Sequence, residues 1–220
     1  STPADTSEQV VEELPPQLEE DLEECPDRIW SATEVSIDES CKDEPEMNQF
    51  SAVVEWDMTA FEEYPDLVRH LAPPMVGSLT DDNGDGIIDD LDIPDIVLIS
   101  GVQTTTHLAG ALRLISGDGT KVHWSQANYI WNGGLYHPIQ HSTPAIGDVD
   151  LDGETEIVTL LRNEAGDSCH YASIDPTGTL KTFNENDSVP CRLNSAALSD
   201  MEGDGSIEVI FGNSIFNRAS

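Results

Sequence analysis

A run of alternating carboxylates organises the rest of this chain: Asp81-Asp82-Asn83-Gly84-Asp85-Gly86-Ile87-Ile88-Asp89-Asp90-Leu91-Asp92-Ile93-Pro94-Asp95. Asp81, Asn83 and Asp85 stand at alternate positions, and Gly86 follows them. Ca²⁺ takes six to eight oxygen ligands, and side chains at positions 1, 3 and 5 of a loop reach one ion together only where the backbone turns sharply at position 6. The spacing therefore predicts a calcium loop, with the turn at Gly86 and a ligand from Ile87 at position 7.

The residue that completes this first loop is ambiguous from the sequence. Asp89 stands at position 9, and Asp92 stands at position 12, where an EF-hand places its bidentate carboxylate. Asp95 is the third candidate, because it precedes an apolar run as the last acid of each later copy does. A true EF-hand would need a helix on both sides, and Pro94 with the β-branched residues after it argues against a helix there.

The same pattern returns twice. The second copy carries carboxylates at Asp148, Asp150, Asp152 and Glu156, and the third carries them at Asp200, Glu202, Asp204 and Glu208. All three copies precede a short apolar run, at residues 96–99, 157–160 and 209–211. Chance seldom reproduces both a loop and its context, so the repetition identifies Ca²⁺ as the expected bound ion.

The repeats contain short predicted strands that are separated by turns. The first unit has four, at residues 75–79, 95–99, 111–116 and 120–124; the second has four, at 144–147, 156–161, 171–175 and 179–183; the third has two, at 195–198 and 208–212. Each calcium loop joins strands one and two. Four short antiparallel strands at a period of roughly 50 to 70 residues are typical of a β-propeller blade. Residues 53–56 resemble the fourth strand at 121–124, so this segment is a candidate to complete a blade.

Composition limits the possible partners. The formal net charge is -34, which excludes nucleic acid and anionic membrane as expected partners, because phosphate binding needs a basic surface. No apolar run of about 18 residues is present, so the sequence predicts no membrane span. Two regions are expected: residues 1–47 form an acidic, largely extended N-terminal arm with a segment that a disulfide could close, and residues 48–220 form the β blades.

The four cysteines allow three connectivities. Proximity in the sequence favours Cys25 with Cys41 and Cys169 with Cys191. Disulfides belong to oxidising compartments, and calcium loops of modest affinity suit extracellular calcium concentrations. Both features predict an extracellular or cell-surface protein.

Other clusters have structural interpretations beside functional ones. Trp124, Tyr129, Trp131 and Tyr136 either pack in the core or form a surface for carbohydrate or protein. His137 and His141 are expected in loops, because Pro138 breaks any helix between them. Ser142 with His141 and Asp148 could suggest a hydrolase triad, but no Gly-x-Ser-x-Gly turn accompanies it, so no catalytic residue is predicted.

The loops, with their entry Pro144-Ala145-Ile146-Gly147-Asp148, their exit Glu156-Ile157-Val158 and the sequence Ile210-Phe211-Gly212, resemble FG-GAP or VCBS repeats, the calcium-binding blades of integrin-α-like propellers. The resemblance covers roughly residues 71–213. It implies a propeller with calcium between strands one and two, and a secreted or surface role in adhesion, carbohydrate contact or assembly. It assigns ligand roles to the following residues: Asp81, Asn83, Asp85, Asp148, Asp150, Asp152, Glu156, Asp200, Glu202, Asp204 and Glu208.

The leading hypothesis is a non-enzymatic, calcium-stabilised all-β protein, secreted or on the cell surface, that acts in adhesion or structural assembly through protein or glycan contact. The alternative is the propeller portion of a polysaccharide-active enzyme. Propellers close with four to eight blades, and this sequence predicts fewer than three. We therefore expect a protein partner, self-assembly into a filament-like array, or a larger propeller of which this chain is a segment.

Overall fold

The computed structural model describes residues 53–102, 109–164, 168–191, 195–212 and 214–216. The chain divides between Ala52 and Val53, and all described residues belong to the second unit. The predicted acidic arm and the proposed Cys25–Cys41 pair lie outside the described residues. The described part is all-β, with strands and turns and no helix, as the sequence predicts. It follows that this part offers no helix with the length and apolarity to cross a membrane.

The first sheet contains β1 (Arg69–His70), β2 (Met75–Gly77), β3 (Asp95–Gly101), β4 (Gly110–Ser116) and β5 (Val122–Gln126). Strands β2 to β5 pair antiparallel in chain order, and β1 pairs with the end of β3 that β2 leaves free. The four predicted strands are therefore confirmed, with small shifts at their ends. Apolar and β-branched residues fill β3, and both of its faces are largely buried, which explains its nearly continuous apolar sequence.

The second sheet repeats this order with β8 (Ala145–Gly147), β9 (Glu156–Asn163), β10 (Ser168–Ile174) and β11 (Leu180–Phe183). It also contains β6 (Tyr129–Trp131), β7 (Gly134–Pro138) and β12 (Val189–Pro190). Strand β7 extends the sheet beside the far end of β9, and β12 does so beside β10. The second sheet is thus a four-stranded meander with additions on both edges.

The β6–β7 hairpin was not predicted as strands. Asn132 and Gly133 have φ of 44° and 78°, the left-handed conformation that a two-residue hairpin turn requires. His137 lies on β7, so its expected place in a loop is wrong; its Nδ1 is 2.9 Å from the Ala127 carbonyl oxygen. The aromatic cluster packs in the core, where Tyr129 is 3% exposed and Tyr136 and Trp131 contact Phe183.

The third sheet contains β13 (Ala196–Ser199), β14 (Glu208–Phe211) and β15 (Ser214–Phe216). The sequence predicted two strands here, and β15 adds a third because its apolar Phe216 packs against Phe211 and Tyr171. The predicted strand at residues 53–56 is not formed: the described Val53–Trp56 segment has no strand, and Val53 and Val54 are exposed.

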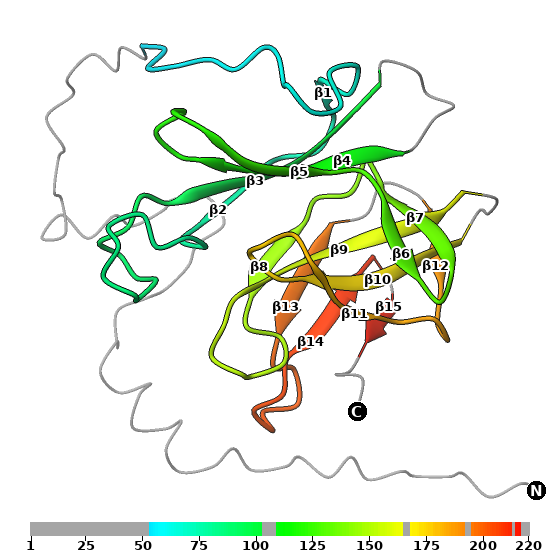
Figure 1. Cartoon of the computed structure of the whole chain (residues 1–220). Helices are drawn as coiled ribbons and strands as arrows, with labels where there is room; N and C mark the ends of the chain where they lie inside the picture. Colours follow the sequence, from blue (N-terminus) through cyan, green and yellow to red (C-terminus); the bar gives the residue numbers. More distant parts are fainter. Residues whose placement is uncertain (1–52, 103–108, 165–167, 192–194, 213, 217–220) are drawn as a thin grey trace, which may run out of the picture. The chain divides into compact units, whose positions relative to one another are not determined.

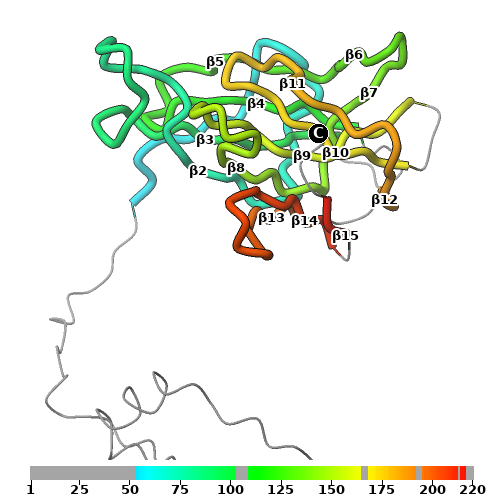
Figure 2. The backbone as a smooth tube through the Cα atoms, turned by 90° about the horizontal axis from the view of Figure 1, so that it is seen from below, coloured from blue at the N-terminus to red at the C-terminus, as the bar shows by residue number. Residues whose placement is uncertain are grey.

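Successive sheets pack face to face around two apolar cores (Figure 1). One core joins residues of the first and second sheets, and the other joins residues of the second and third. The initial strands β2, β8 and β13 follow one another as neighbours (Figure 2). Glycine allows this approach, because a Cβ at Gly147 would lie 2.7 Å from Leu198 Cδ1, and one at Gly77 would lie 3.5 Å from Ile146.

A tryptophan contact also repeats from one sheet to the next. Trp124 of β5 donates from Nε1 to the Pro176 carbonyl at 2.8 Å, in the β10–β11 turn. Trp56 makes the same contact with the β4–β5 turn, donating to the Gly117 carbonyl at 3.1 Å. A Cβ at Gly119 would lie 2.5 Å from Trp56. Trp56 therefore stands toward the first sheet as Trp124 stands toward the second, which explains the sequence likeness of their segments.

Arg113 fixes the segment that precedes the first sheet. Its guanidinium is fully buried and donates to the carbonyl oxygens of Glu63, Tyr64 and Leu67 and to the hydroxyls of Ser100 and Ser125. Burial lowers the pKa of Arg113 to about 10. The five bonds satisfy the buried charge, so residues 61–67 are held across the outer part of the sheet.

A disulfide joins Cys169 of β10 to Cys191, with 5.1 Å between the Cα atoms and 22 residues of sequence separation. This confirms the predicted pair. Cys169 is fully buried in the core between the second and third sheets. The bond therefore ties the segment that follows β12 to the centre of β10.

We expect Cys169→Ser/Cys191→Ser to lower the free energy of unfolding by about 3 kcal/mol, because the open chain regains the entropy of a loop of this length. Urea unfolding of the oxidised protein and of the double variant measures the loss. A reduced wild-type protein serves as the control, and it should match the double variant. Equal stability of the oxidised and reduced forms would contradict the prediction.

Candidate metal sites

The three acidic loops share one pattern of local hydrogen bonds. The carboxylate at the first position accepts backbone N–H groups from the residues that follow it in the turn. Asp81 accepts from Gly84, Asp85 and Gly86, and Asp200 accepts from Gly203, Asp204 and Gly205. Asp148 accepts from Asp152 and Gly153. The loops are therefore equivalent in structure as well as in sequence.

These bonds also explain the electrostatics of the first position. The N–H of Gly205 and the other turn amides hold the pKa of Asp200 below its ordinary value, although partial burial opposes them. The carboxylate is thus kept ionised, as metal binding requires. The same turn brings the third and fifth positions toward the first.

The acid that begins the second strand of each sheet also has a repeated role. Asp95 accepts the N–H of Leu79 at 3.1 Å, Glu156 accepts that of Val149 at 2.9 Å, and Glu208 accepts that of Met201 at 2.8 Å. Strand register agrees, since these acids pair with Gly77, Gly147 and Ser199 at the ends of the first strands. Asp95 is therefore the structural counterpart of Glu156 and Glu208.

The first loop carries an insertion that separates its three candidate closing residues. Asp92 closes the inserted loop, because its Oδ1 accepts the N–H of Asp82 and Asn83 and its Oδ2 accepts that of Asp89. The Asp89 N–H is the main cause that lowers the pKa of Asp92. Asp89 accepts the N–H of Leu91. Asp95 is left for a different group of side chains.

Two groups of acidic and histidine side chains among the described residues place their ligand atoms within 4.8 Å of one another. The first consists of Asp148, Asp150, Asp152 and Glu156 in the second loop. These are the four residues that the sequence predicts there. The predicted ligands of the first and third loops keep the shared turn geometry but do not form such a group in the described part.

The second-loop group already encloses a positive charge. The Lys181 Nζ lies 2.5 Å from Asp152 Oδ2, 2.7 Å from Glu156 Oε1 and 3.1 Å from Asp150 Oδ2. Burial opposes the ammonium charge, but the hydrogen bonds to Asp152, Glu156 and Asp150 outweigh it and raise the pKa of Lys181. Asp150 Oδ1 is buried without a hydrogen-bond partner. The oxygen donors and the enclosed ammonium show that this site fits a cation.

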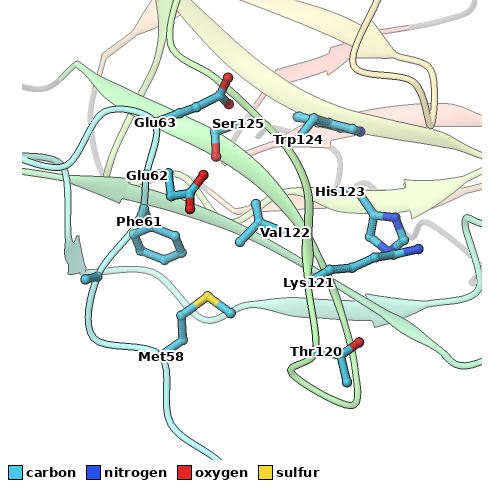
Figure 3. Close-up of a pocket in the computed structure, with 11 residues that line it drawn as sticks. Met58, Phe61, Glu62, Glu63, Thr120, Lys121, Val122, His123, Trp124 and Ser125 are labelled. Carbon is cyan, nitrogen blue, oxygen red and sulfur yellow. The ribbon is translucent and has the colours of Figure 1, made fainter.

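The second group consists of Asp82, Asp95 and His123. His123 Nε2 lies 2.9 Å from Asp95 Oδ1. Burial raises the pKa of Asp95, and the bonds from Thr80 and Leu79 partly offset this effect. His123 also borders a pocket of about 550 Å³ between residues 58–63 and β5 (Figure 3), in which Phe61 and Val122 lie across the strand from His123.

His123 and Lys181 occupy equivalent positions in their sheets. The β4–β5 register skips His123, and the β10–β11 register skips Lys181, so each residue sits in a β-bulge of the outermost strand. A bulge redirects one side chain, and here it turns toward the acid that begins the second strand. Neither residue was predicted, because the two hairpin turns differ in length and a linear alignment does not place them together.

Leu151 is the exception among the turn residues of the loops. Its φ is 59°, whereas Gly84 and Gly203 hold the equivalent place at 79° and 70°. A left-handed conformation costs a residue with a Cβ about 1–2 kcal/mol. Leu151 is 49% exposed, so its side chain recovers little of this cost through burial.

We expect Leu151→Gly to leave the free energy of unfolding unchanged or to raise it by up to about 1 kcal/mol, because relief of the strain exceeds the added entropy of the unfolded chain. Leu151→Ala keeps the Cβ and is the matched control. Gly203→Leu should lose about 1–2 kcal/mol at the equivalent place. Urea unfolding of the three variants provides the measurement, and a glycine variant less stable than the alanine variant would refute the assignment of strain.

Comparisons with known proteins give a limited result. No protein-family model matches the chain, and a search of curated proteins gives no match either. Among solved structures, the chain is similar to the V. cholerae biofilm matrix protein Bap1, with a TM-score of 0.62 and 26% sequence identity. The similarity covers 76% of this chain and 26% of the Bap1 chain. The chain thus spans about a quarter of that protein, and an all-β fold is what the two have in common.

Proposed function

We propose that this chain is a calcium-binding β-propeller-type module that acts in adhesion or structural assembly outside the cell. The observation that carries the proposal is the threefold recurrence of one unit: an initial strand, an acidic loop with the same internal hydrogen bonds, and a second strand whose first residue is a buried acid. In this proposal the sheets are FG-GAP or VCBS-type blades. No catalytic step is assigned to them.

The arrangement of the sheets supports the propeller part of the proposal. Blades of a propeller pack face to face around a central axis with their first strands innermost. Here β2, β8 and β13 are successive neighbours, and a parallel bridge joins Thr143 to Ser195 just before β8 and β13. The contact of Trp56 with the first sheet places residues 53–56 where the outer strand of a preceding blade would lie.

The donor set supports calcium as the ion of the loops. Carboxylate, amide and carbonyl oxygens are the ligands that Ca²⁺ prefers, and the glycine turn is the one such loops use. The ligands assigned are Asp81, Asn83, Asp85, Ile87 and Asp89 in the first loop, Asp148, Asp150, Asp152 and Glu156 in the second, and Asp200, Glu202, Asp204 and Glu208 in the third. The structure adds Asp92 as a candidate for the first loop.

Two observations support an extracellular role in assembly. The similar protein Bap1 is a biofilm matrix protein, and the Cys169–Cys191 disulfide suits an oxidising compartment. The net charge of -34 makes copies of the chain repel one another, and divalent ions reduce such repulsion. We infer that calcium both stabilises the blades and permits close association.

We expect Lys181→Met to raise the calcium affinity of the second loop at least about tenfold, because the variant removes a cation that competes for the same carboxylates. In chelator the same variant should melt lower than the wild type, since three carboxylates lose their only nearby ammonium in the described structure. Calcium titration by calorimetry and melting with and without chelator provide both readouts.

Lys121→Met is the matched control, because Lys121 is exposed and contacts Asp82 alone, at 3.4 Å. It should change neither quantity much. Wild-type protein should itself melt higher in calcium, by the stabilisation that ligand binding gives the native state. An unchanged melting temperature in chelator, or equal calcium affinity of Lys181→Met and the wild type, would contradict the proposal.

We expect self-association in millimolar calcium. Strand β15 has no further strand beside it among the described residues, and an unpaired strand edge is a template for association. Native mass spectrometry or sedimentation should show oligomers that chelator dissociates. A compact monomer at all calcium concentrations would refute the assembly part of the proposal and leave the calcium part to the titration.

A further inference from the structure

The Asp95 carboxylate has one oxygen engaged and one without a hydrogen bond. The side chain is completely buried, and its Oδ2 accepts from the Leu79 N–H at 3.1 Å and the Thr80 hydroxyl at 3.0 Å. Its Oδ1 is buried and makes no hydrogen bond. His123 Nε2 is likewise buried without one, although it lies only 2.9 Å from that oxygen. Two unsatisfied polar atoms thus face the same point in the interior.

Asp82 brings a third donor to this point from the inserted loop. Its side chain is 13% exposed, and its ligand oxygen lies within 4.8 Å of those of Asp95 and His123. The Thr80 hydroxyl lies between the two aspartates, 3.2 Å from Asp82 Oδ2 and 3.0 Å from Asp95 Oδ2. The positions of both carboxylates are therefore set by neighbours that are themselves fixed to the sheet.

We propose that Asp82, Asp95 and His123 bind a divalent transition-metal ion, of which Zn²⁺ is the natural probe, at a site separate from the calcium loops. Calcium loops use oxygen donors alone, whereas imidazole nitrogen with carboxylates suits zinc and its neighbours in the first transition row. The two carboxylates balance the charge of a divalent ion. Three protein donors leave further coordination positions for water.

The spacing of the donors agrees with this chemistry. Zinc lies about 2.0–2.2 Å from nitrogen and carboxylate ligands, so two neighbouring ligands in tetrahedral or octahedral geometry are about 2.9–3.4 Å apart. The distance between Asp95 Oδ1 and His123 Nε2 is 2.9 Å. Hydrogen bonds to the other oxygen of Asp95 hold the carboxylate in orientation, as partners of ligand groups do in established metal sites.

The second sheet offers an internal comparison. In that sheet the bulge residue is Lys181, which brings an ammonium to the buried Glu156. In the first sheet the bulge residue is His123, which brings a nitrogen lone pair to the buried Asp95 when the ring is neutral. The same place in the fold therefore holds a cation in one sheet and a further metal ligand in the other. Lys121 approaches only the outer oxygen of Asp82 and is 54% exposed.

The competing explanation is an ion pair between a protonated His123 and Asp95. It requires no metal and predicts no zinc affinity. The two explanations differ in stoichiometry, so the test counts zinc bound by the intact chain in saturating calcium, which fills the oxygen-only loops first. Calorimetry gives the number and affinity of sites, and Co²⁺ substitution gives a visible absorption that reports nitrogen ligation.

We expect one zinc equivalent per chain in millimolar calcium, and His123→Ala should weaken its binding by more than the roughly 10–100-fold that loss of a mere hydrogen-bond partner costs. His141→Ala is the matched control, because His141 is a half-buried histidine outside both groups. It should keep the wild-type stoichiometry and the Co²⁺ absorption. Asp82→Asn gives a second loss variant near the surface, in case changes at the buried positions impair folding.

Absence of zinc binding in the wild type would overturn the proposal, and so would equal zinc affinity in His123→Ala and His141→Ala. Asp81→Asn separates this outcome from failure of the calcium loops: it should weaken calcium binding in the first loop and leave the zinc equivalent in place. Loss of zinc from Asp81→Asn with retention in His123→Ala would place the ion in the loop and refute the site.

Discussion

The rest of the structure depends on a buried carboxylate at the start of the second strand in each sheet. Asp95, Glu156 and Glu208 are 0%, 0% and 2% exposed, and each accepts a backbone N–H from the end of the first strand. One hydrogen bond thus joins the loop to the strand that leaves it. Because a buried charge is costly unless it is paired, this choice obliges the fold to bring a cation to the same place.

The first two sheets meet this requirement with the same backbone device and different chemistry. A β-bulge in the outermost strand turns one side chain inward, and the side chain is Lys181 in one sheet and His123 in the other. The ammonium contacts three carboxylates at once, whereas the imidazole faces a single buried oxygen. The two sheets therefore share an architecture but differ in which ions they can accept.

The sequence was sufficient to predict the strands that follow the loops, because the apolar runs after Asp95, Glu156 and Glu208 have no other use than burial. It was insufficient for the β6–β7 hairpin, where aromatic residues were interpreted as a cluster and not as paired strands. It also could not separate Asp92 from Asp95, since the insertion changes the spacing and only strand register shows which acid is equivalent to Glu156. His123 and Lys181 were missed because bulges are not visible in a linear pattern.

The third sheet has the buried acid without the matching strand. Glu208 forms no ion pair within the described residues, and the outermost strand that carries the bulge in the other two sheets is not found among them. In the first two sheets that strand closes the sheet edge and also delivers the side chain that meets the acid. The open edge beside β15 and the missing partner of Glu208 are therefore one requirement, and a single added strand with a basic or metal-binding residue at the bulge would satisfy both. A strand from another chain or another part of the same protein is expected to be selected by that residue as much as by backbone pairing.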